Sequence, residues 1–326
     1  MAQPNLRTRQ LTKRFGTRIG VDALTFDAER GEVVGLLGPN GAGKTTTIRL
    51  LSTVLAATSG DFSVAGVPSS RPAEVRRRVG ALPESAGYPR YQTGLEYLTY
   101  FARLFGHNRA DAIRLASRLL AEFGLAERAA RPISTYSRGM RQRLGIARAL
   151  VNDPDVVFLD EPTLGLDPAG QLQILRVVRD IAARRRATVV LSTHMLAEVE
   201  AVCSKVLILD RGRVIKWSTV AEVTAAVGAP RSAVIRVPLD QIGTAVEAVG
   251  ALPGRTVSAA DERPDALRVT TTGSSDGMNA VLAELLRASV PILAFEVEGT
   301  RLTDAYLSLT GDAGAAADAD IAKGAP

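Results

Sequence analysis

The sequence contains very few cysteine and histidine residues. Among its 326 residues there is one cysteine, Cys203, and there are two histidines. A single cysteine excludes an internal disulfide framework and a metal cluster held by several cysteines, and two histidines leave little room for a histidine metal site.

Long apolar runs are also missing. No run approaches the roughly 18 apolar residues of a membrane-spanning helix, and the first residues lack the apolar segment of a signal peptide. Hydrophobic residues make up 46% and charged residues 23% of the chain, as in ordinary soluble proteins. We therefore expect a cytosolic chain, long enough for one domain of ordinary size and one small domain.

Acidic residues are the minority charge, 34 against 40 basic residues, which leaves a net charge of +6. Such a charge suits an anionic membrane surface, nucleic acid, or a surface whose charges meet no partner. Basic residues cluster only at 76–78 and 184–186, and for both clusters we favour an ordinary solvated surface.

A glycine-rich segment at residues 38–45 is the strongest signal in the sequence. It matches G-x-x-x-x-G-K-[ST] between an apolar run at 33–37, a predicted strand, and a helix predicted from Thr46. Glycines let the backbone approach a polyanion closely, and the helix N-terminus adds partial positive charge. Lys44 can then reach the β- and γ-phosphates, and the Thr45 hydroxyl can hold Mg²⁺. The expected nucleotide-binding residues are Gly38, Pro39, Asn40, Gly41, Ala42, Gly43, Lys44, Thr45 and Thr46.

The segment before this loop, residues 6–31, is predicted to form short strands joined by turns. It contains Phe15, whose ring can stack on a nucleotide base or pack in the core as an ordinary strand aromatic. The local sequence leaves both interpretations open. Further strands are predicted at 60–66 and 78–84.

Helical periodicity replaces the strand pattern from residue 93 to about 127, which predicts a helical subdomain standing off the main sheet. It ends at a helix predicted to run to residue 150, with Ser137 as its N-cap. A helix N-terminus with a serine and a glycine is a candidate anion site. Any capped basic helix has the same pattern, so this motif is only moderately specific.

An apolar strand at 155–159 ends in two adjacent carboxylates, Asp160 and Glu161. Because ligands bind beyond the carboxyl ends of such strands, and neighbouring side chains there point in different directions, the two acids can have separate roles. Asp160 suits Mg²⁺, and Glu161 can activate a water molecule for attack on the γ-phosphate. A turn with two solvated acids is disfavoured by the long apolar strand. Another strand, at 188–193, ends at His194, which places that histidine where it can meet phosphate.

In this order the motifs resemble the ATP-binding subunits of ABC transporters, over roughly residues 6–219. The resemblance implies an α/β fold, a P-loop NTPase domain of the ABC type at residues 1–226. It would combine a mixed sheet core, an antiparallel β subdomain and a helical subdomain at about 90–150. The corresponding positions are Phe15 (A-loop), 38–45 (Walker A), Glu84 (Q-loop), Ser137, Arg138, Gly139 and Met140 (signature), Asp160 (Walker B), Glu161 (catalytic glutamate), Asp167 (D-loop) and His194 (switch histidine).

The resemblance also implies a mechanism and partners. Two copies would sandwich two ATP molecules, and Ser137 and Gly139 of one copy would contact the γ-phosphate held by Lys44 of the other. Lys44, Glu161 and His194 are then the catalytic candidates, and Thr45, Glu84 and Asp160 the candidates for Mg²⁺. Closure on ATP would drive a separate membrane permease from the cytoplasmic face of the membrane, with no nucleic acid partner.

Two positions depart from the family pattern. Glu84 stands where the family usually has glutamine, and the signature reads Tyr-Ser-Arg-Gly-Met instead of Leu-Ser-Gly-Gly-Gln, although its serine and second glycine remain. Both variants resemble the daunorubicin-resistance branch of drug exporters, whose ATPase and permease are separate chains. We therefore expect export of a drug, an antibiotic or another hydrophobic compound, with import left open and the cargo not named by this chain.

The remaining sequence predicts an accessory domain at residues 227–311. Strands and helices are expected in the order β-α-β-β-α-β, the split βαβ or ferredoxin-like arrangement, with a last helix near 302–309. Regulation, dimer contact and passive stabilisation all remain open as its role. Alanine, glycine and aspartate dominate residues 312–326, which predicts a disordered tail.

The sequence gives less support to two other functions. A soluble ABC ATPase acting on ribosomes or DNA would normally carry two phosphate loops or a long coiled-coil insertion, and this chain has neither. A regulatory nucleotide-binding module without turnover would not need both Glu161 and His194.

Overall fold

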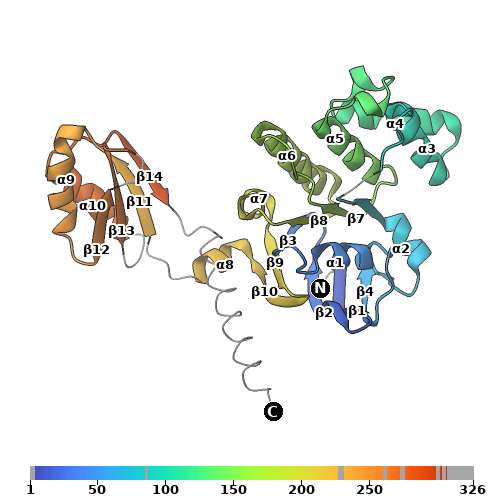
Figure 1. The fold of residues 1–326 in the computed structure, drawn as a ribbon, viewed down its shortest axis with the longest axis horizontal. Helices are drawn as coiled ribbons and strands as arrows, with labels where there is room; N and C mark the ends of the chain where they lie inside the picture. Colours follow the sequence, from blue (N-terminus) through green and yellow to red (C-terminus); the bar gives the residue numbers. More distant parts are fainter. Residues whose placement is uncertain are drawn as a thin grey trace, which may run out of the picture. The chain divides into compact units, whose positions relative to one another are not determined.

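A computed structural model describes residues 4–84, 87–226, 231–259, 263–271, 276–298, 302 and 306. The chain divides into two compact units, Met1–Val220 and Ala221–Pro326 (Figure 1). Within the described residues, no helix has both the length and the apolar composition needed to cross a membrane.

The first unit is built on a six-stranded sheet of order β10-β9-β3-β8-β7-β6 (Figure 1). Its inner strands pair in parallel, and β10 adds an antiparallel edge. Every residue of β3, β7 and β8 is buried, as expected for parallel strands covered on both faces. The strands are β3 (Val33–Leu37), β6 (Val79–Leu82), β7 (Val156–Asp160), β8 (Thr188–Thr193), β9 (Lys205–Asp210) and β10 (Arg213–Thr219).

A second, antiparallel sheet of order β2-β1-β4-β5 completes the β structure of this unit. Its strands are β1 (Leu6–Phe15), β2 (Arg18–Ala28), β4 (Ser59–Val64) and β5 (Val67–Pro68). Short strands were expected up to residue 31, but β1 and β2 form one long hairpin paired from Leu6↔Ala28 to Phe15↔Arg18. Register shifts interrupt this pairing, which explains why the sequence pattern predicts several short strands.

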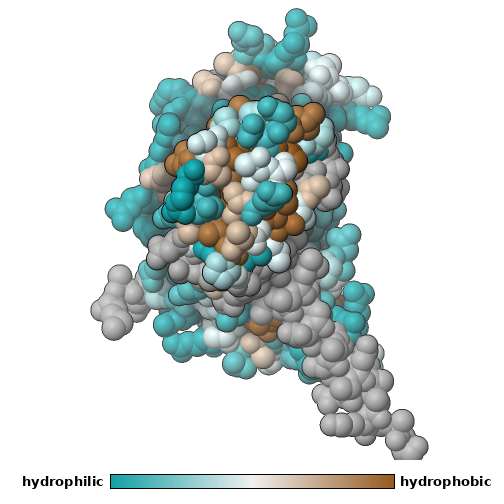
Figure 2. Space-filling model, turned by 90° about the vertical axis from the view of Figure 1, so that its left-hand side faces the viewer, coloured by the Kyte–Doolittle hydropathy of each residue, from teal (hydrophilic) through white to brown (hydrophobic). Residues whose placement is uncertain are grey.

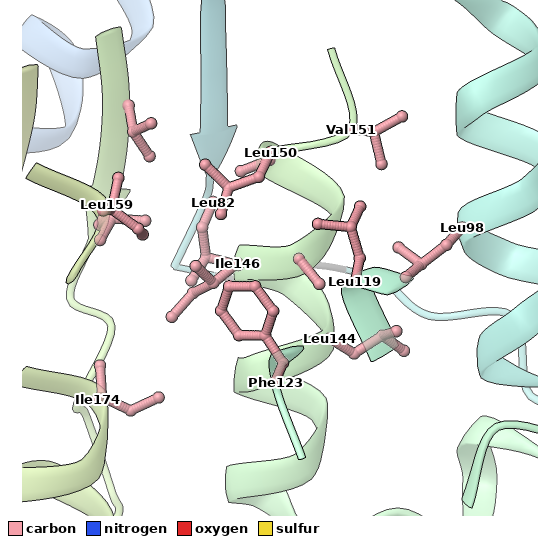
Figure 3. Close-up of a cluster of buried hydrophobic side chains, with 14 of the residues drawn as sticks. Leu82, Leu98, Leu119, Phe123, Leu144, Ile146, Leu150, Val151, Leu159 and Ile174 are labelled. Atoms are coloured by element: carbon pink, nitrogen blue, oxygen red, sulfur yellow. The ribbon is translucent and has the colours of Figure 1, made fainter. Parts of the chain in front are cut away.

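Three of the helices form the predicted helical subdomain: α3 (Gly94–Leu104), α4 (Arg109–Glu122) and α5 (Arg138–Ala149). Thr93 and Glu96 form a reciprocal capping box at the start of α3, which is why the helical pattern begins at that residue. Leu98, Leu119, Phe123, Leu144 and Ile146 are among the side chains that fill the subdomain core (Figure 3).

The first unit has further helices besides these three. They are α1 (Lys44–Leu51), α2 (Pro72–Arg78), α6 (Pro168–Arg185), α7 (Leu196–Val202), the start of α8 (Val220–Ala226) and the short 3-10 helices at Ala126–Arg128 and Ile133–Thr135. Several residues of the arginine clusters have surface partners within the unit: Arg76 donates to Thr53, Arg78 pairs with Asp155, Arg184 pairs with Asp180, and Arg185 pairs with Glu122. All of the cluster arginines are exposed except Arg185, which is half-buried, so the expectation of an ordinary solvated surface stays a prediction.

The second unit has the predicted β-α-β-β-α-β order. Its four-stranded antiparallel sheet has the order β12-β13-β11-β14, and its core includes Ile235, Val269 and Leu285. The elements are β11 (Arg231–Arg236), a 3-10 helix (Leu239–Gln241), α9 (Ile242–Gly250), β12 (Arg255–Ala259), β13 (Ala266–Thr271), α10 (Asp276–Arg287) and β14 (Ala294–Glu298). Apart from residues 302 and 306, the last predicted helix and the predicted disordered tail lie outside the described residues.

Part of the second unit's surface is apolar. The face toward the viewer in Figure 2 carries hydrophobic side chains between polar ones. The large apolar side chains that are exposed in this unit include Leu239, Val246, Leu286 and Leu293.

Candidate nucleotide-binding site

The glycine-rich loop joins the end of β3 to the start of α1, as predicted. Gly43 adopts a left-handed conformation with φ 106°, and a Cβ on it would lie 2.7 Å from the carbonyl oxygen of Gly20. A Cβ on Gly38 would lie 2.3 Å from the carbonyl oxygen of Leu209. Only glycine fits where another backbone approaches so closely, so these two residues let the loop pack against neighbouring chain segments.

A cleft of about 760 Å³ opens above this loop, a size within the usual range of small-molecule sites. Most of the predicted site residues line it: Phe15, Pro39, Asn40, Gly41, Gly43, Lys44, Thr45, Thr46, Glu84, Glu161 and His194. Ala42 is instead buried in the core. Arg18 and Arg49 also line the cleft; the sequence analysis missed both because no motif marks them.

Phe15 lies at the edge of this cleft with 46% of its surface exposed. That exposure rules out the interpretation of Phe15 as a buried core aromatic. Lys13 is its neighbour, with Nζ 5.3 Å from the ring centroid.

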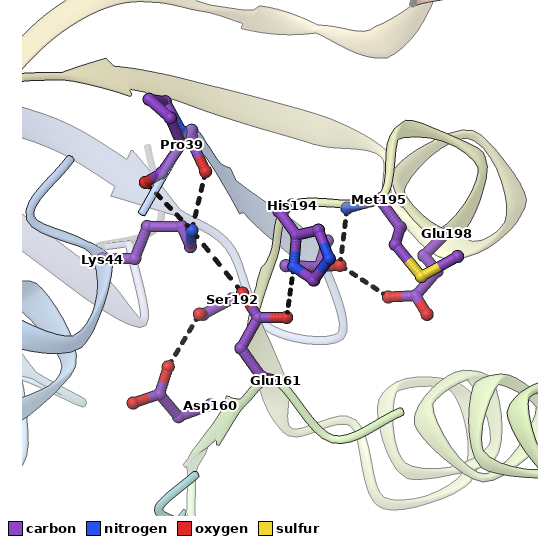
Figure 4. Close-up of polar contacts among 10 residues, drawn as sticks. Pro39, Lys44, Asp160, Glu161, Ser192, His194, Met195 and Glu198 are labelled. Carbon is purple, nitrogen blue, oxygen red and sulfur yellow. Dashed lines mark hydrogen bonds and ion pairs between the residues drawn. The ribbon is translucent and has the colours of Figure 1, made fainter. Parts of the chain in front are cut away.

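Lys44 begins α1 and is almost completely buried. Its Nζ donates to the carbonyl oxygens of Gly38 at 2.6 Å and Pro39 at 3.3 Å. The same ammonium lies 3.5 Å from Oε1 of Glu161 (Figure 4). The loop thus holds its own lysine at the floor of the cleft.

Glu161 follows β7 with a left-handed backbone, φ 48°. Its carboxylate is 10% exposed and has a partner on each oxygen: Lys44 on Oε1, and on Oε2 the Nδ1 atom of His194 at 3.0 Å (Figure 4). Three candidates that are far apart in the sequence therefore meet around one carboxylate.

Asp160, the preceding residue, makes a different contact, as the divergence of adjacent side chains predicts. It is 1% exposed and accepts a hydrogen bond from Ser192 Oγ at 2.7 Å. Asp160 and Ser192 are paired residues of β7 and β8. Ser192 is not among the residues predicted from the sequence, where its only signal is a hydroxyl two residues before His194.

Thr45 and Asp160 carry oxygen atoms, the ligand type that magnesium prefers, and such an ion is usually held by one or two protein groups together with substrate phosphates. Thr45 lines the cleft, whereas Asp160 is buried and is not part of the lining. Glu84 is exposed on the lining of the same cleft. Among the residues that the structure describes, no group of three or more His, Cys, Asp or Glu side chains is arranged to hold a metal alone. Any magnesium here would therefore depend on phosphate oxygens for part of its coordination.

The predicted signature residues do not line this cleft. Ser137 caps α5, where its Oγ accepts from Met140 N at 3.3 Å, and Asp167 caps α6 by accepting from Gly170 N at 3.2 Å. Ser137, Arg138, Gly139 and Asp167 line a separate hollow of about 670 Å³. Met140 instead packs against the helical subdomain core.

A glycine-rich loop between a buried strand and a helix, with acidic residues at the end of another parallel strand of the same sheet, defines a P-loop nucleoside triphosphatase. Comparison with known proteins narrows that class. The family model described as ABC transporter matches residues 21–164. The chain is 37% identical to the daunorubicin/doxorubicin resistance ATP-binding protein DrrA of Streptomyces peucetius, over 94% of this chain and 92% of that protein. The chain belongs to the family of ABC transporter ATP-binding proteins, and it is an ATPase of that family.

Solved structures agree with this assignment. The structure of an ATP-binding subunit of an ABC transporter has a TM-score of 0.62 and 32% identity, covering 68% of this chain and 93% of that one. A dimeric ATP-binding cassette bound to ADP and Pi has a TM-score of 0.60, covering 66% of this chain and 98% of that one. Its identity is 21%, so this second similarity concerns the fold. The predicted ABC ATPase fold is confirmed.

Proposed function

We propose that this chain is the ATP-hydrolysing subunit of an ABC exporter and that it works as a dimer with a separate membrane permease. The observation that carries the proposal is the Glu161 carboxylate between Lys44 and His194, in a cleft of nucleotide size. This arrangement provides a cation for the phosphates and a carboxylate for activating water.

ATP would lie along the glycine-rich loop. Phe15 would stack on the adenine, the amides of residues 38–46 would surround the phosphates, and Lys44 would bind the β- and γ-phosphates. Thr45, Asp160 and Glu84 would hold Mg²⁺, which when bound neutralises charge on the phosphate oxygens. Glu161 would orient and deprotonate the attacking water, and His194 would contact the γ-phosphate from the end of β8.

The separation of the two hollows supports the dimer. Because Ser137, Gly139 and Asp167 line a different hollow from Lys44, one copy does not bring both sets of residues to the same nucleotide cleft. A second copy facing the first would place its Ser137 and Gly139 at the γ-phosphate and its Asp167 near the shared interface. The fold neighbour described as a dimer bound to ADP and Pi supports this arrangement.

The similarity to a daunorubicin/doxorubicin resistance protein supports drug or antibiotic export. The chain would act at the cytoplasmic face of a membrane, with the passage for the cargo in the permease. Residues 1–226 would form the ATPase domain, and 227–311 an accessory domain that contacts a partner or regulates the dimer. The exposed apolar side chains of that domain support a contact role.

Two measurements test the proposal. In gel filtration with light scattering, the Glu161→Gln protein should be a dimer with Mg²⁺ and ATP and a monomer without nucleotide. Affinity isolation of the wild-type chain from native membranes should recover one integral membrane protein. A monomer under all nucleotide conditions would contradict the dimer, and recovery with ribosomes would replace transport by another function.

A further inference from the structure

Three consecutive residues at the end of β8 each contact a different carboxylate. Two of these carboxylates, Asp160 and Glu161, already have roles in the proposed function. The third, on α7, has none. The pairs are Ser192 with Asp160 at 2.7 Å, Thr193 with Glu198 at 2.7 Å, and His194 with Glu161 at 3.0 Å (Figure 4).

Glu198 is a charged side chain in an unusual place. It is 3% exposed, and its Oε2 accepts the hydrogen bond from Thr193 Oγ1. Its Oε1 is buried without a hydrogen-bond partner among the described residues. Burying a carboxyl group with an unpaired oxygen is costly, so a gain in stability does not explain why Glu198 lies here.

Thr193 uses its hydroxyl twice. The side chain is fully buried, and Oγ1 donates to Glu198 and accepts from the backbone N–H of Met195 at 3.0 Å. One hydroxyl therefore connects the end of β8, the next turn of chain and α7. His194 lies in the chain between Thr193 and Met195, which this hydroxyl connects.

The His194 ring has little else to hold it. Its side chain is 47% exposed, and its one hydrogen bond among the described residues is to Glu161. An exposed ring has several rotamers available, so its direction depends on the backbone that presents it. That backbone is held on both sides by the Thr193 hydroxyl.

We propose that Thr193 and Glu198 are positioning residues that hold the His194 ring opposite Glu161. The inference rests on the proposed function only in giving His194 a part in hydrolysis. Thr193 orders the turn that carries His194, and Glu198 fixes the Thr193 hydroxyl so that its lone pair faces the Met195 amide. Neither side chain touches the nucleotide.

The test removes the contact from each side. Thr193→Val removes the hydroxyl with little change of shape, and Glu198→Met removes the acceptor oxygens and keeps the length of the side chain. Thr193→Ser and Glu198→Gln are the conservative partners, because each retains the hydrogen-bonding oxygen. Glu200→Gln is the control on the same helix, since Glu200 is exposed.

The first readout is the imidazole signal of His194 in the nucleotide-free protein. The chain has two histidines, so His107→Asn leaves His194 as the one remaining ring in a ¹H–¹³C spectrum. We expect the two disruptive variants to shift or broaden this signal, and the two conservative variants and Glu200→Gln to keep it. A merely structural role would lower the melting temperature without moving the signal of the folded protein.

The second readout is ATP hydrolysis. A displaced ring should lower kcat about 10- to 100-fold, the size of effect expected from a small misplacement of a reacting group, with KM for ATP changed less than about twofold. If Thr193→Val fails to fold, Glu198→Met removes the same contact and leaves the Met195 amide bonded. A wild-type His194 signal in a folded disruptive variant would overturn the inference. Loss of hydrolysis in Glu161→Gln would still support the proposed function, so the two ideas can fail separately.

Discussion

The carboxylate of Glu161 and the ring of His194 are in contact, with Oε2 lying 3.0 Å from Nδ1. The two residues are 33 positions apart in the chain, and each follows the end of a parallel strand, β7 or β8. Glu161 reaches this position with φ 48°, a conformation that costs a non-glycine residue roughly 1–2 kcal/mol. On the other carboxylate oxygen, Oε1, the same side chain pairs with Lys44.

Replacing Glu161 tests its part in hydrolysis. Glu161→Gln keeps the shape of the side chain and removes the base, so kcat should fall about 10²- to 10⁴-fold, while ATP binds within a few-fold of its wild-type affinity. Steady-state phosphate release and fluorescent-nucleotide titration measure the two quantities, with Glu200→Gln as the control. Hydrolysis at the wild-type rate in the Gln variant would remove Glu161 from its proposed role.

Glu84 provides a test of the magnesium site. If its carboxylate contributes to holding the ion, Glu84→Gln should raise the Mg²⁺ concentration for half-maximal hydrolysis by about threefold to tenfold, since loss of one charge weakens binding of a hard cation. The measurement is a Mg²⁺ titration of ATPase activity at constant ATP. An unchanged or lower requirement for Mg²⁺ would show that Glu84 is not a ligand.

Two glycines of the loop form a matched pair. Both have left-handed φ angles, 85° for Gly41 and 106° for Gly43. A Cβ added at Gly41 would have no atom within 4 Å, whereas a Cβ added at Gly43 would clash with the Gly20 carbonyl oxygen. Both alanine variants bear a strain of roughly 1–2 kcal/mol, and Gly43→Ala adds the steric clash. We expect Gly43→Ala to melt at the lower temperature and to lose ATP binding in calorimetry. Equal melting temperatures would show that the loop moves to accept the Cβ.

Asn5 connects the start of the chain to the main sheet. It is 5% exposed, and its Nδ2 donates to the Asp155 carbonyl oxygen at 2.8 Å and to Thr188 Oγ1 at 2.9 Å. Asn5→Ala leaves both acceptors without this donor, so the free energy of unfolding should fall by about 1–3 kcal/mol. Urea unfolding of both proteins measures it. Asn152→Ala removes two hydrogen bonds that the side-chain amide donates at a partly buried site. It should lower the free energy of unfolding by less, and the opposite ranking would contradict this prediction.

Cys203 should titrate outside the usual range of a thiol. Burial, together with the nearby Glu198 carboxylate, raises the pKa of Cys203 to about 12. Between its ordinary pKa of about 8.5 and this value, the unfolded chain loses the thiol proton while the folded chain keeps it, so stability falls as the pH rises. Urea unfolding at pH 8 and pH 10 should show a loss about 2 kcal/mol larger for the wild type than for Cys203→Ala. Equal losses would indicate an ordinary pKa.

Local patterns in the sequence were sufficient to predict the phosphate loop and many of the helices and strands. The phosphate loop needs its glycines, lysine and threonine at set spacings between a strand and a helix, so residues 38–45 carry the information by themselves. The capped starts of α3 and α5 depend on residues three positions apart, and buried strands of a parallel sheet are visible as apolar runs. The β-α-β-β-α-β order of the second unit follows from such signals, and the ABC ATPase fold was implied by the resemblance of the ordered motifs to a known family.

Contacts between distant segments needed the tertiary structure. The local sequence around Phe15 fits a core position and a position beside the cleft equally well. Only the tertiary structure shows that the side chain is exposed. The pairing of β7 with β8 decides that Asp160 meets Ser192, and the turn into α7 decides that Thr193 meets Glu198. The sequence by itself determined which groups are present and which elements carry them. The order of the strands decided that Asp160 meets Ser192 and that Glu161 meets His194, because these residues are 32 and 33 positions apart and no local spacing relates them. Thr193 and Glu198 are only five positions apart, and the direction of the turn into α7 decided that they meet.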